Sequence, residues 1–168
     1  MRSTVVELNV NGKPQEMLVK PGSTLLGTLR ETLGLTAAKR GCDVGTCGTC
    51  TVIVDDKPMM SCMIPVETVN GSAVETLEGR SGADGEVDGL QASFLENFAT
   101  QCGFCTPGMI VAGRALLEEN PAPTRDEVVT AISGNVCRCT GYESIVTAIL
   151  DAAEQRAGAG EPDAVAQA

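Results

Sequence analysis

The chain has 168 residues, 43% of them hydrophobic, and its 22 acidic and 12 basic side chains give a formal net charge of −10. This length and hydrophobic content suit one domain or two small ones and are not typical of disorder. The acidic charge argues against nucleic acid or an anionic membrane surface as a partner. There is no His, which excludes catalytic triads, Rieske ligation and His-containing zinc sites, and leaves eight Cys as the main chemical resource.

The beginning of the chain carries Arg2 and Glu7 and lacks the apolar segment of a signal peptide. No run of about 18 apolar residues follows, so a membrane-spanning helix is not expected. We therefore expect a soluble, cytoplasmic protein. In a reducing cytoplasm, eight cysteines indicate metal ligands or redox groups rather than a disulfide framework.

The first half of the chain is strand-rich. Alternating apolar residues around the turn dipeptide Asn11-Gly12, and again around Asp55-Asp56, predict two β-hairpins. Between them, Ser23 or Thr24 can cap a helix that ends near Gly34 and carries four Leu on one face. The expected strands cover residues 5–10, 17–19, 51–54, 59–62 and 73–77.

The second half is predicted to be helical, after a Gly-rich, polar stretch without periodicity. We therefore expect a first domain at residues 1–78, a linker at 79–87, a second domain at 88–156 and a tail at 157–168. Four helices are predicted in the second domain, because apolar residues recur there at helical spacing. Their start signals are capping boxes at Asp88, Thr124 and Thr140 and a first-turn proline at Pro107.

Four cysteines of the first domain form one candidate metal site. Three have the spacing C-x4-C-x2-C of the plant-type [2Fe-2S] ligand loop, and a fourth follows at the end of the second hairpin. Gly41, Gly45 and Gly48 let the backbone bend around a buried cluster, so that N–H groups can point at sulfur. The alternatives are a four-cysteine zinc knot and buried free thiols. These four residues are Cys42, Cys47, Cys50 and Cys62.

The second domain holds a second set of four cysteines. Cys102-x2-Cys105 leads into a predicted helix N-terminus, whose dipole favours an anionic cluster. Cys137-x-Cys139 precedes the last predicted helix, so two helix N-termini can converge on one metal centre. A thioredoxin-like dithiol at Cys102 and Cys105 is the alternative, and it accounts for only two of the eight thiols.

Three segments together carry a specific resemblance. GCDVGTCGTCT at 41–51, QCGFCTPG at 101–108 and CRCTGY at 137–142 resemble the small iron-sulfur subunit of the xanthine oxidase family of molybdenum hydroxylases. The resemblance runs from residue 2 to about 155, and Thr49 stands where many relatives have Ala. It implies an α+β fold class, with an N-terminal plant-type ferredoxin-like β-grasp domain followed by an all-α four-helix-bundle domain.

The resemblance also implies roles for single residues. The cysteines of the first domain would bind an outer [2Fe-2S] cluster, and those of the second domain an inner one. The residues that match Gln101 and Cys139 hydrogen-bond a molybdopterin in relatives, so these two are the expected cofactor-binding residues. The expected iron ligands are Cys42, Cys47, Cys50, Cys62, Cys102, Cys105, Cys137 and Cys139.

For function, the resemblance implies an electron-transfer subunit of an oxidoreductase. A large subunit would hold molybdenum on molybdopterin, as the cytosine dinucleotide, and would hydroxylate a substrate such as an N-heteroaromatic or an aldehyde with oxygen from water. This chain would pass electrons singly through two clusters to FAD on a medium subunit, in a heterotrimer or a dimer of heterotrimers. It shows no nucleotide-binding loop and no catalytic residue of its own. The alternatives are a free two-cluster ferredoxin and a zinc-stabilised interaction module.

Overall fold

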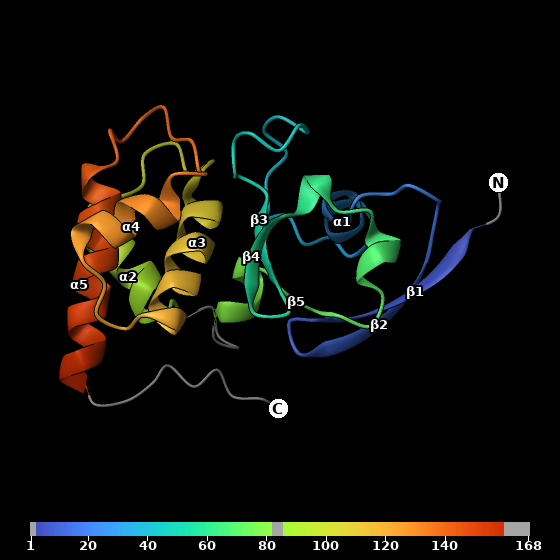
Figure 1. Cartoon of the computed structure of the whole chain (residues 1–168), viewed down its shortest axis with the longest axis horizontal. Coiled ribbons are helices and arrows are strands. Elements are labelled where there is room, and N and C mark those ends of the chain that lie inside the picture. The colour runs from blue at the N-terminus through green and yellow to red at the C-terminus, as the bar shows by residue number, and fades with distance from the viewer. Residues whose placement is uncertain (1–2, 82–85, 160–168) are drawn as a thin grey trace.

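The computed structural model of the chain describes residues 3–81 and 86–159. A β-sheet with short helical turns occupies one end of the molecule, and a group of helices occupies the other (Figure 1). The predicted α+β class is therefore confirmed, with the sheet first in the sequence and the helices second. Among the described residues, no helix has the length and apolar character needed to cross a membrane.

Five strands form one sheet: β1 (Thr4–Val10), β2 (Lys13–Val19), β3 (Thr51–Val54), β4 (Lys57–Met60) and β5 (Ala73–Glu75). Their order is β2-β1-β5-β3-β4, and only the β1–β5 pair is parallel. Both predicted hairpins are confirmed. In each turn, Asn11-Gly12 and Asp55-Asp56, both residues have positive φ, as a type I′ turn requires.

The predicted helix between the hairpins begins at Thr24, whose hydroxyl oxygen accepts a hydrogen bond from Gly27 N at 3.1 Å. α1 (Leu25–Gly27) continues into a wider turn over Thr28–Thr32, where Leu33 N donates to Thr28 O at 3.1 Å. The leucines of this helix are buried against one face of the sheet, which gives the first half its own core. Its most buried members include Leu25, Leu26, Leu29, Val6, Val52, Val66 and Val74.

Four main helices form the described part of the second half, residues 86–159, in agreement with the prediction. They are α2 (Gly89–Glu96), α3 (Thr106–Glu119), α4 (Arg125–Ile132) and α5 (Glu143–Ala159). Asp88 caps α2 through Gln91 N, at 2.8 Å, and Thr124 and Glu127 form the predicted reciprocal capping box of α4. A separate apolar core lies between the helices, with Leu90, Phe94, Met109, Leu117, Ile145 and Ile149 at its centre.

The predicted capping box at Thr140 was wrong. α5 begins only at Glu143, because Gly141 and Tyr142 both have φ of 70° and interrupt helical geometry. The Thr140 hydroxyl instead donates to Cys137 Sγ at 3.1 Å and accepts from Tyr142 N at 3.2 Å. This residue therefore serves the cysteine loop and not the helix end.

The predicted linker lies partly outside the described residues, since 82–85 are not described. Its beginning is a 3-10 turn over Leu77–Arg80, and Arg80 forms ion pairs with Glu75 and Glu118, which tie the turn to the sheet and to α3. α5 continues to Ala159, three residues into the predicted tail, and residues 160–168 lie outside the described residues.

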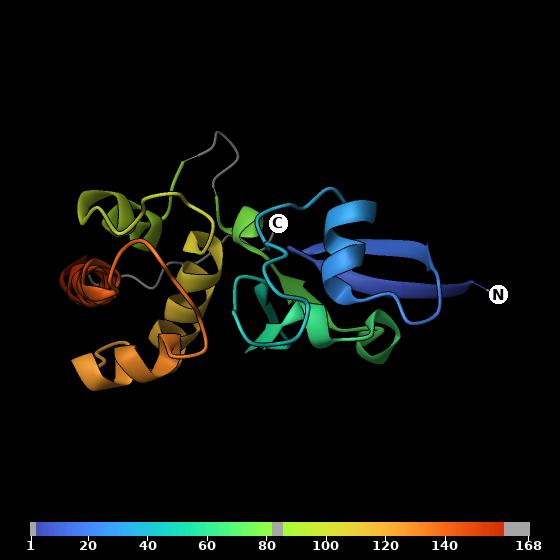
Figure 2. The same ribbon diagram turned by 90° about the horizontal axis from the view of Figure 1, so that it is seen from above.

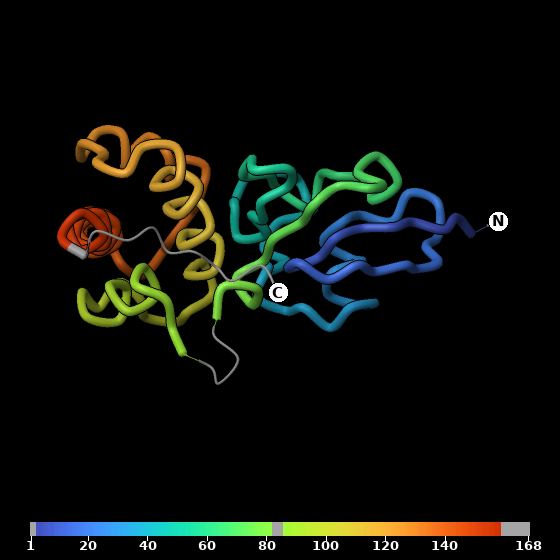
Figure 3. Tube along the Cα trace, turned by 90° about the horizontal axis from the view of Figure 1, so that it is seen from below, coloured from blue at the N-terminus to red at the C-terminus, as the bar shows by residue number. Residues whose placement is uncertain are grey.

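α3 joins the two halves. It packs against β3 and β4 on one side and against the other helices on the other. Seen along a perpendicular direction, α3 is the helix that faces the sheet (Figures 2 and 3). Because its N-terminus follows one cysteine pair directly, this packing brings the cysteine loops of the two halves toward each other.

Candidate metal centres

The first cysteine loop runs from Gly41 into β3 and is shaped by left-handed backbone. Asp43, Gly45 and Gly48 have φ of 57°, 72° and 68°. A Cβ at Gly45 would come within 2.9 Å of the Met63 side chain, so the loop also needs glycine there for space. These residues let the loop turn tightly between its cysteines.

Backbone N–H groups of this loop point at sulfur. Val44 N and Thr46 N lie 3.4 and 3.5 Å from Cys42 Sγ, and Thr49 Oγ1 lies 3.3 Å from Cys47 Sγ. The hydrogen bonds to Cys42, that from Val44 first, lower the pKa of its thiol to about 6. A thiol with this pKa is largely thiolate at neutral pH, which is the form that binds metal.

The four cysteines of the first loop form two pairs. Cys42 is hydrogen-bonded to Cys47, and the buried Cys62 to the buried Cys50. Burial, followed by the Cys50 hydrogen bond, raises the pKa of the Cys62 thiol to about 11. Two partly exposed sulfurs thus face solvent, while two others reach into the core of the sheet domain.

The second set also forms two pairs. Cys102, from the loop between α2 and α3, lies 3.7 Å (Sγ to Sγ) from Cys139, in the loop between α4 and α5, and both are exposed. The buried Cys105 is hydrogen-bonded to the buried Cys137. Burial, and then Cys137, raise the pKa of the Cys105 thiol to about 12.

Several neighbouring groups form hydrogen bonds with Cys137, through both its sulfur and its backbone N–H. Burial raises the pKa of its thiol, but the Thr140 hydroxyl and nearby backbone N–H groups outweigh burial, and the pKa is lowered overall. Its own N–H donates to the Tyr142 hydroxyl oxygen at 2.9 Å. The positive φ of Tyr142 therefore serves to bring the phenol back over the loop.

The pairing distinguishes between the two metal centres that the spacing allows. A structural zinc site needs four ligands around one ion. Within residues 3–81 and 86–159, however, no three His, Cys, Asp or Glu side chains gather where one ion could be held. A [2Fe-2S] cluster takes two cysteines on each of two irons, which is the arrangement of two pairs seen in both sets. The cysteine-only ligand sets of the two loops therefore fit [2Fe-2S] clusters.

The two cysteine loops are in direct contact. Val136 N donates to Cys47 O at 2.8 Å, and the buried Asn135 donates through Nδ2 to Gly48 O at 2.9 Å. Side chains would not fit at this seam, because a Cβ on Gly48 would lie 2.4 Å from Gly134 O. A Cβ on Gly108, at the start of α3, would lie 2.6 Å from Gly48 O.

Gln101, expected to contact a cofactor, is exposed and directly precedes the exposed Cys102. The structure thus places Gln101 and Cys139 at the surface beside the second set. Sequence reasoning missed Asn135, whose partner is 87 residues away, and the role of Tyr142. The only sequence signal for either is its closeness to Cys137.

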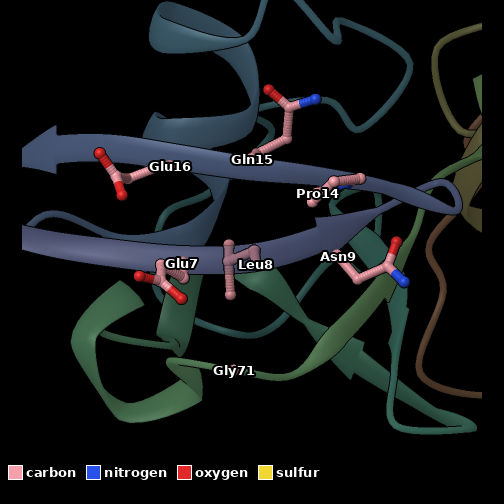
Figure 4. A pocket seen from close by; sticks show the side chains of 7 residues that line it. All are labelled: Glu7, Leu8, Asn9, Pro14, Gln15, Glu16 and Gly71. Carbon is pink, nitrogen blue, oxygen red and sulfur yellow. The ribbon is translucent and has the colours of Figure 1, made fainter.

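An open groove lies away from both cysteine sets. It has a volume of about 460 Å³ and runs across the β1–β2 hairpin, with Glu7 and Glu16 directly opposite each other on the two strands (Figure 4). No cysteine lines it. It therefore belongs to neither metal centre.

Comparison with known proteins agrees with this geometry. The family described as "2Fe-2S iron-sulfur cluster binding domain" matches residues 8–80, and that described as "[2Fe-2S] binding domain" matches residues 76–150. The chain is 45% identical over 155 residues to the nicotinate dehydrogenase small FeS subunit of Eubacterium barkeri, covering 92% of this chain and 98% of that one.

Two solved structures are equally similar. A chain of quinoline 2-oxidoreductase from Pseudomonas putida 86 superposes with a TM-score of 0.90 at 45% identity, covering 96% of this chain and 100% of that chain. The aldehyde oxidoreductase of Desulfovibrio desulfuricans superposes with a TM-score of 0.88 at 43% identity over 94% of this chain. The match covers only 17% of that second chain, so there the same unit is part of a much longer polypeptide.

Proposed function

The chain belongs to the family of small [2Fe-2S] subunits of molybdenum hydroxylases, and from this premise we propose how its residues perform electron transfer. It is an electron-transfer subunit of these oxidoreductases, with two [2Fe-2S] domains. When bound, each [2Fe-2S] cluster accepts and releases one electron at a time. The observation that carries the assignment of ligands is that each matched [2Fe-2S] domain contains one set of four cysteines, with Cys102 Sγ and Cys139 Sγ 3.7 Å apart in the second set.

In the first site, Cys42 and Cys47 would hold one iron and Cys50 and Cys62 the other. N–H groups of the loop donate to sulfur and stabilise its negative charge, which the exposed side of this site requires. In the second site, Cys102 and Cys139 would hold one iron, and the buried pair of Cys105 and Cys137 the other.

A short covalent and hydrogen-bonded route connects the two ligand sets. Cys47 belongs to the first set, and its carbonyl oxygen accepts the N–H of Val136, which is bonded to Cys137 of the second set. The glycines at the seam let the loops approach this closely. We propose that this contact keeps the two sites at one fixed separation, which rapid electron transfer between them needs.

We propose a large subunit that holds molybdenum on molybdopterin cytosine dinucleotide as the electron donor, and FAD on a medium subunit as the acceptor. Gln101 and Cys139 would meet the pterin, which is supported by their exposure beside the second set. The complex would be a heterotrimer or a dimer of heterotrimers in the cytoplasm. Because the two matches at 45% identity are named for nicotinate and quinoline, and the aldehyde oxidoreductase match is at 43%, we propose an N-heteroaromatic substrate rather than an aldehyde.

The test is EPR spectroscopy of the dithionite-reduced complex, with iron, sulfide and molybdenum quantified on the same sample. We expect two distinct cluster signals with about four iron atoms per copy of this chain. Cys62→Ser should remove only one signal and Cys105→Ser only the other, which makes each variant the control for its counterpart. Two signals without molybdenum would indicate a free ferredoxin, and a colourless zinc protein would refute electron transfer.

A further inference from the structure

Phe98 stands in a backbone conformation that suits glycine. α2 ends in a Schellman motif, in which Ala99 N donates to Phe94 O at 2.9 Å and Phe98 N to Leu95 O at 3.2 Å. The residue between the helix end and Ala99 must be left-handed, and Phe98 has φ of 50°. Glycine is usual there because a side chain is strained in this region, most of all a bulky one. The motif therefore does not explain the phenylalanine.

The core does not explain it either. Phe98 is 83% exposed, the highest value among the large apolar residues that the structure describes as exposed. Leu95, one helical turn earlier, is 61% exposed. The fold therefore does not account for an apolar side chain on strained backbone in water, and such strain is typical of binding sites.

Phe98 lies close to the second cysteine set. It is four residues before Cys102, so their Cα atoms are at most about 14 Å apart. Cys102 and Cys139 are exposed, and a partner that receives or donates electrons here must cover them. A stable interface buries about 800 Å² on each partner, a patch roughly 30 Å across, so a partner centred on this pair also reaches Phe98.

We propose that Phe98 and Leu95 form an anchor that inserts into an apolar pocket of the large, molybdopterin-binding subunit. This inference rests on the proposed function and adds the place of contact. Aromatic side chains are the usual anchors of such interfaces. Glu96 beside them is exposed and the chain has a net charge of −10, so the pocket of the partner should be surrounded by cationic residues. The same negative charge disfavours a second copy of this chain as the partner.

The test compares tagged wild type with Phe98→Gly and Phe98→Asn, each isolated as the molybdenum-containing complex and then diluted. The probe is molybdenum retained per tagged chain. Both substitutions keep a residue that tolerates positive φ, so the melting temperature of the isolated chain should stay the same or rise. We expect both variants to lose molybdenum at about tenfold higher concentration than wild type. Phe98→Trp should retain it.

Leu18→Ser is the matched control, because Leu18 is 68% exposed on β2, in the other half of the molecule. It should leave molybdenum retention unchanged. Wild-type retention in Phe98→Gly and Phe98→Asn would overturn the anchor, as would loss of FAD with molybdenum retained, which would place Phe98 against the medium subunit. If the wild type itself never carries molybdenum, the proposed function is wrong. The anchor is then wrong as well, but this result is distinguishable from a wild type that binds molybdenum and variants that retain it.

Discussion

At the scale of single residues, the cysteine loops depend on glycines both for positive φ and for close approach of the backbone. Gly48 has φ of 68° and also lies where a Cβ would be 2.4 Å from Gly134 O. Gly22 has φ of 80° but nothing within 4 Å of a Cβ. Substitutions at the two glycines therefore separate two contributions to stability. One is the strain of left-handed backbone, and the other is the steric clash where the two halves meet.

We expect Gly48→Ala to lower the free energy of unfolding by about 3 kcal/mol, since backbone strain and a steric clash add. Gly22→Ala should cost only about 1 kcal/mol, the strain alone. Urea unfolding of the iron-loaded chain measures both. Equal losses for the two variants would mean that the loops can move apart to make room for the methyl group.

At the scale of elements, the α4 capping box offers a test with a pH signature. Thr124 donates to Glu127 through both its N–H and its hydroxyl, and these hydrogen bonds lower the pKa of the Glu127 carboxyl. A lowered folded-state pKa means that the ionised form contributes stability above the unfolded-state pKa. That contribution is lost as the pH falls through the folded-state pKa.

Thr124→Ala should cost about 1 kcal/mol at pH 7, because it removes the N-cap hydroxyl of α4. The difference from wild type should shrink in acid, because protonated Glu127 no longer gains from the cap. Urea midpoints at neutral pH and below the ordinary pKa of a glutamate check this. Thr68→Ala is a control, since its exposed hydroxyl bonds only to the backbone of its own turn. A difference that stays constant with pH would contradict a contribution from the hydroxyl–carboxylate bond, since the Thr124 N–H bond to Glu127 is present in both proteins.

The same elements show what local sequence could predict. The hairpin turns, the Thr24 cap and the Asp88 and Thr124 caps depend on residues within four positions of each other, and all were predicted. The Thr140 box was predicted from an equally good local pattern and failed, because Gly141 and Tyr142 have positive φ and α5 begins only at Glu143. Cysteine spacing indicated two metal sites, but the contact between Asn135 and Gly48 is set by the packing of α3 on the sheet.

At the scale of the whole molecule, each half has its own small core, and we expect the metal to supply what those cores lack. Domains of roughly 70 to 80 residues bury too little apolar area to be very stable alone. Removing iron with a chelator under reducing conditions should lower the melting temperature by more than about 10 °C, equivalent to about 2 kcal/mol or more. Calorimetry before and after reconstitution measures this. An unchanged melting temperature would show that the cores suffice.

The seam between the halves decides whether they unfold together. Asn135 is buried there and joins the second cysteine loop to the first, while α3 packs on β3 and β4. We expect the iron-loaded chain to unfold in one calorimetric transition. Asn135→Ala should cost about 2 kcal/mol by leaving a cavity and losing a buried hydrogen bond.

Gly48 O keeps Thr51 as a donor in this variant, so the first loop remains intact and the loss falls on the coupling between the halves. The single transition should therefore separate into two. Ser133→Ala, an exposed change two residues away, should leave one transition, since its hydroxyl bonds only within its own helix end. One transition in Asn135→Ala, shifted as a whole, would mean that α3 alone couples the two halves and that the loop contact serves the metal sites only.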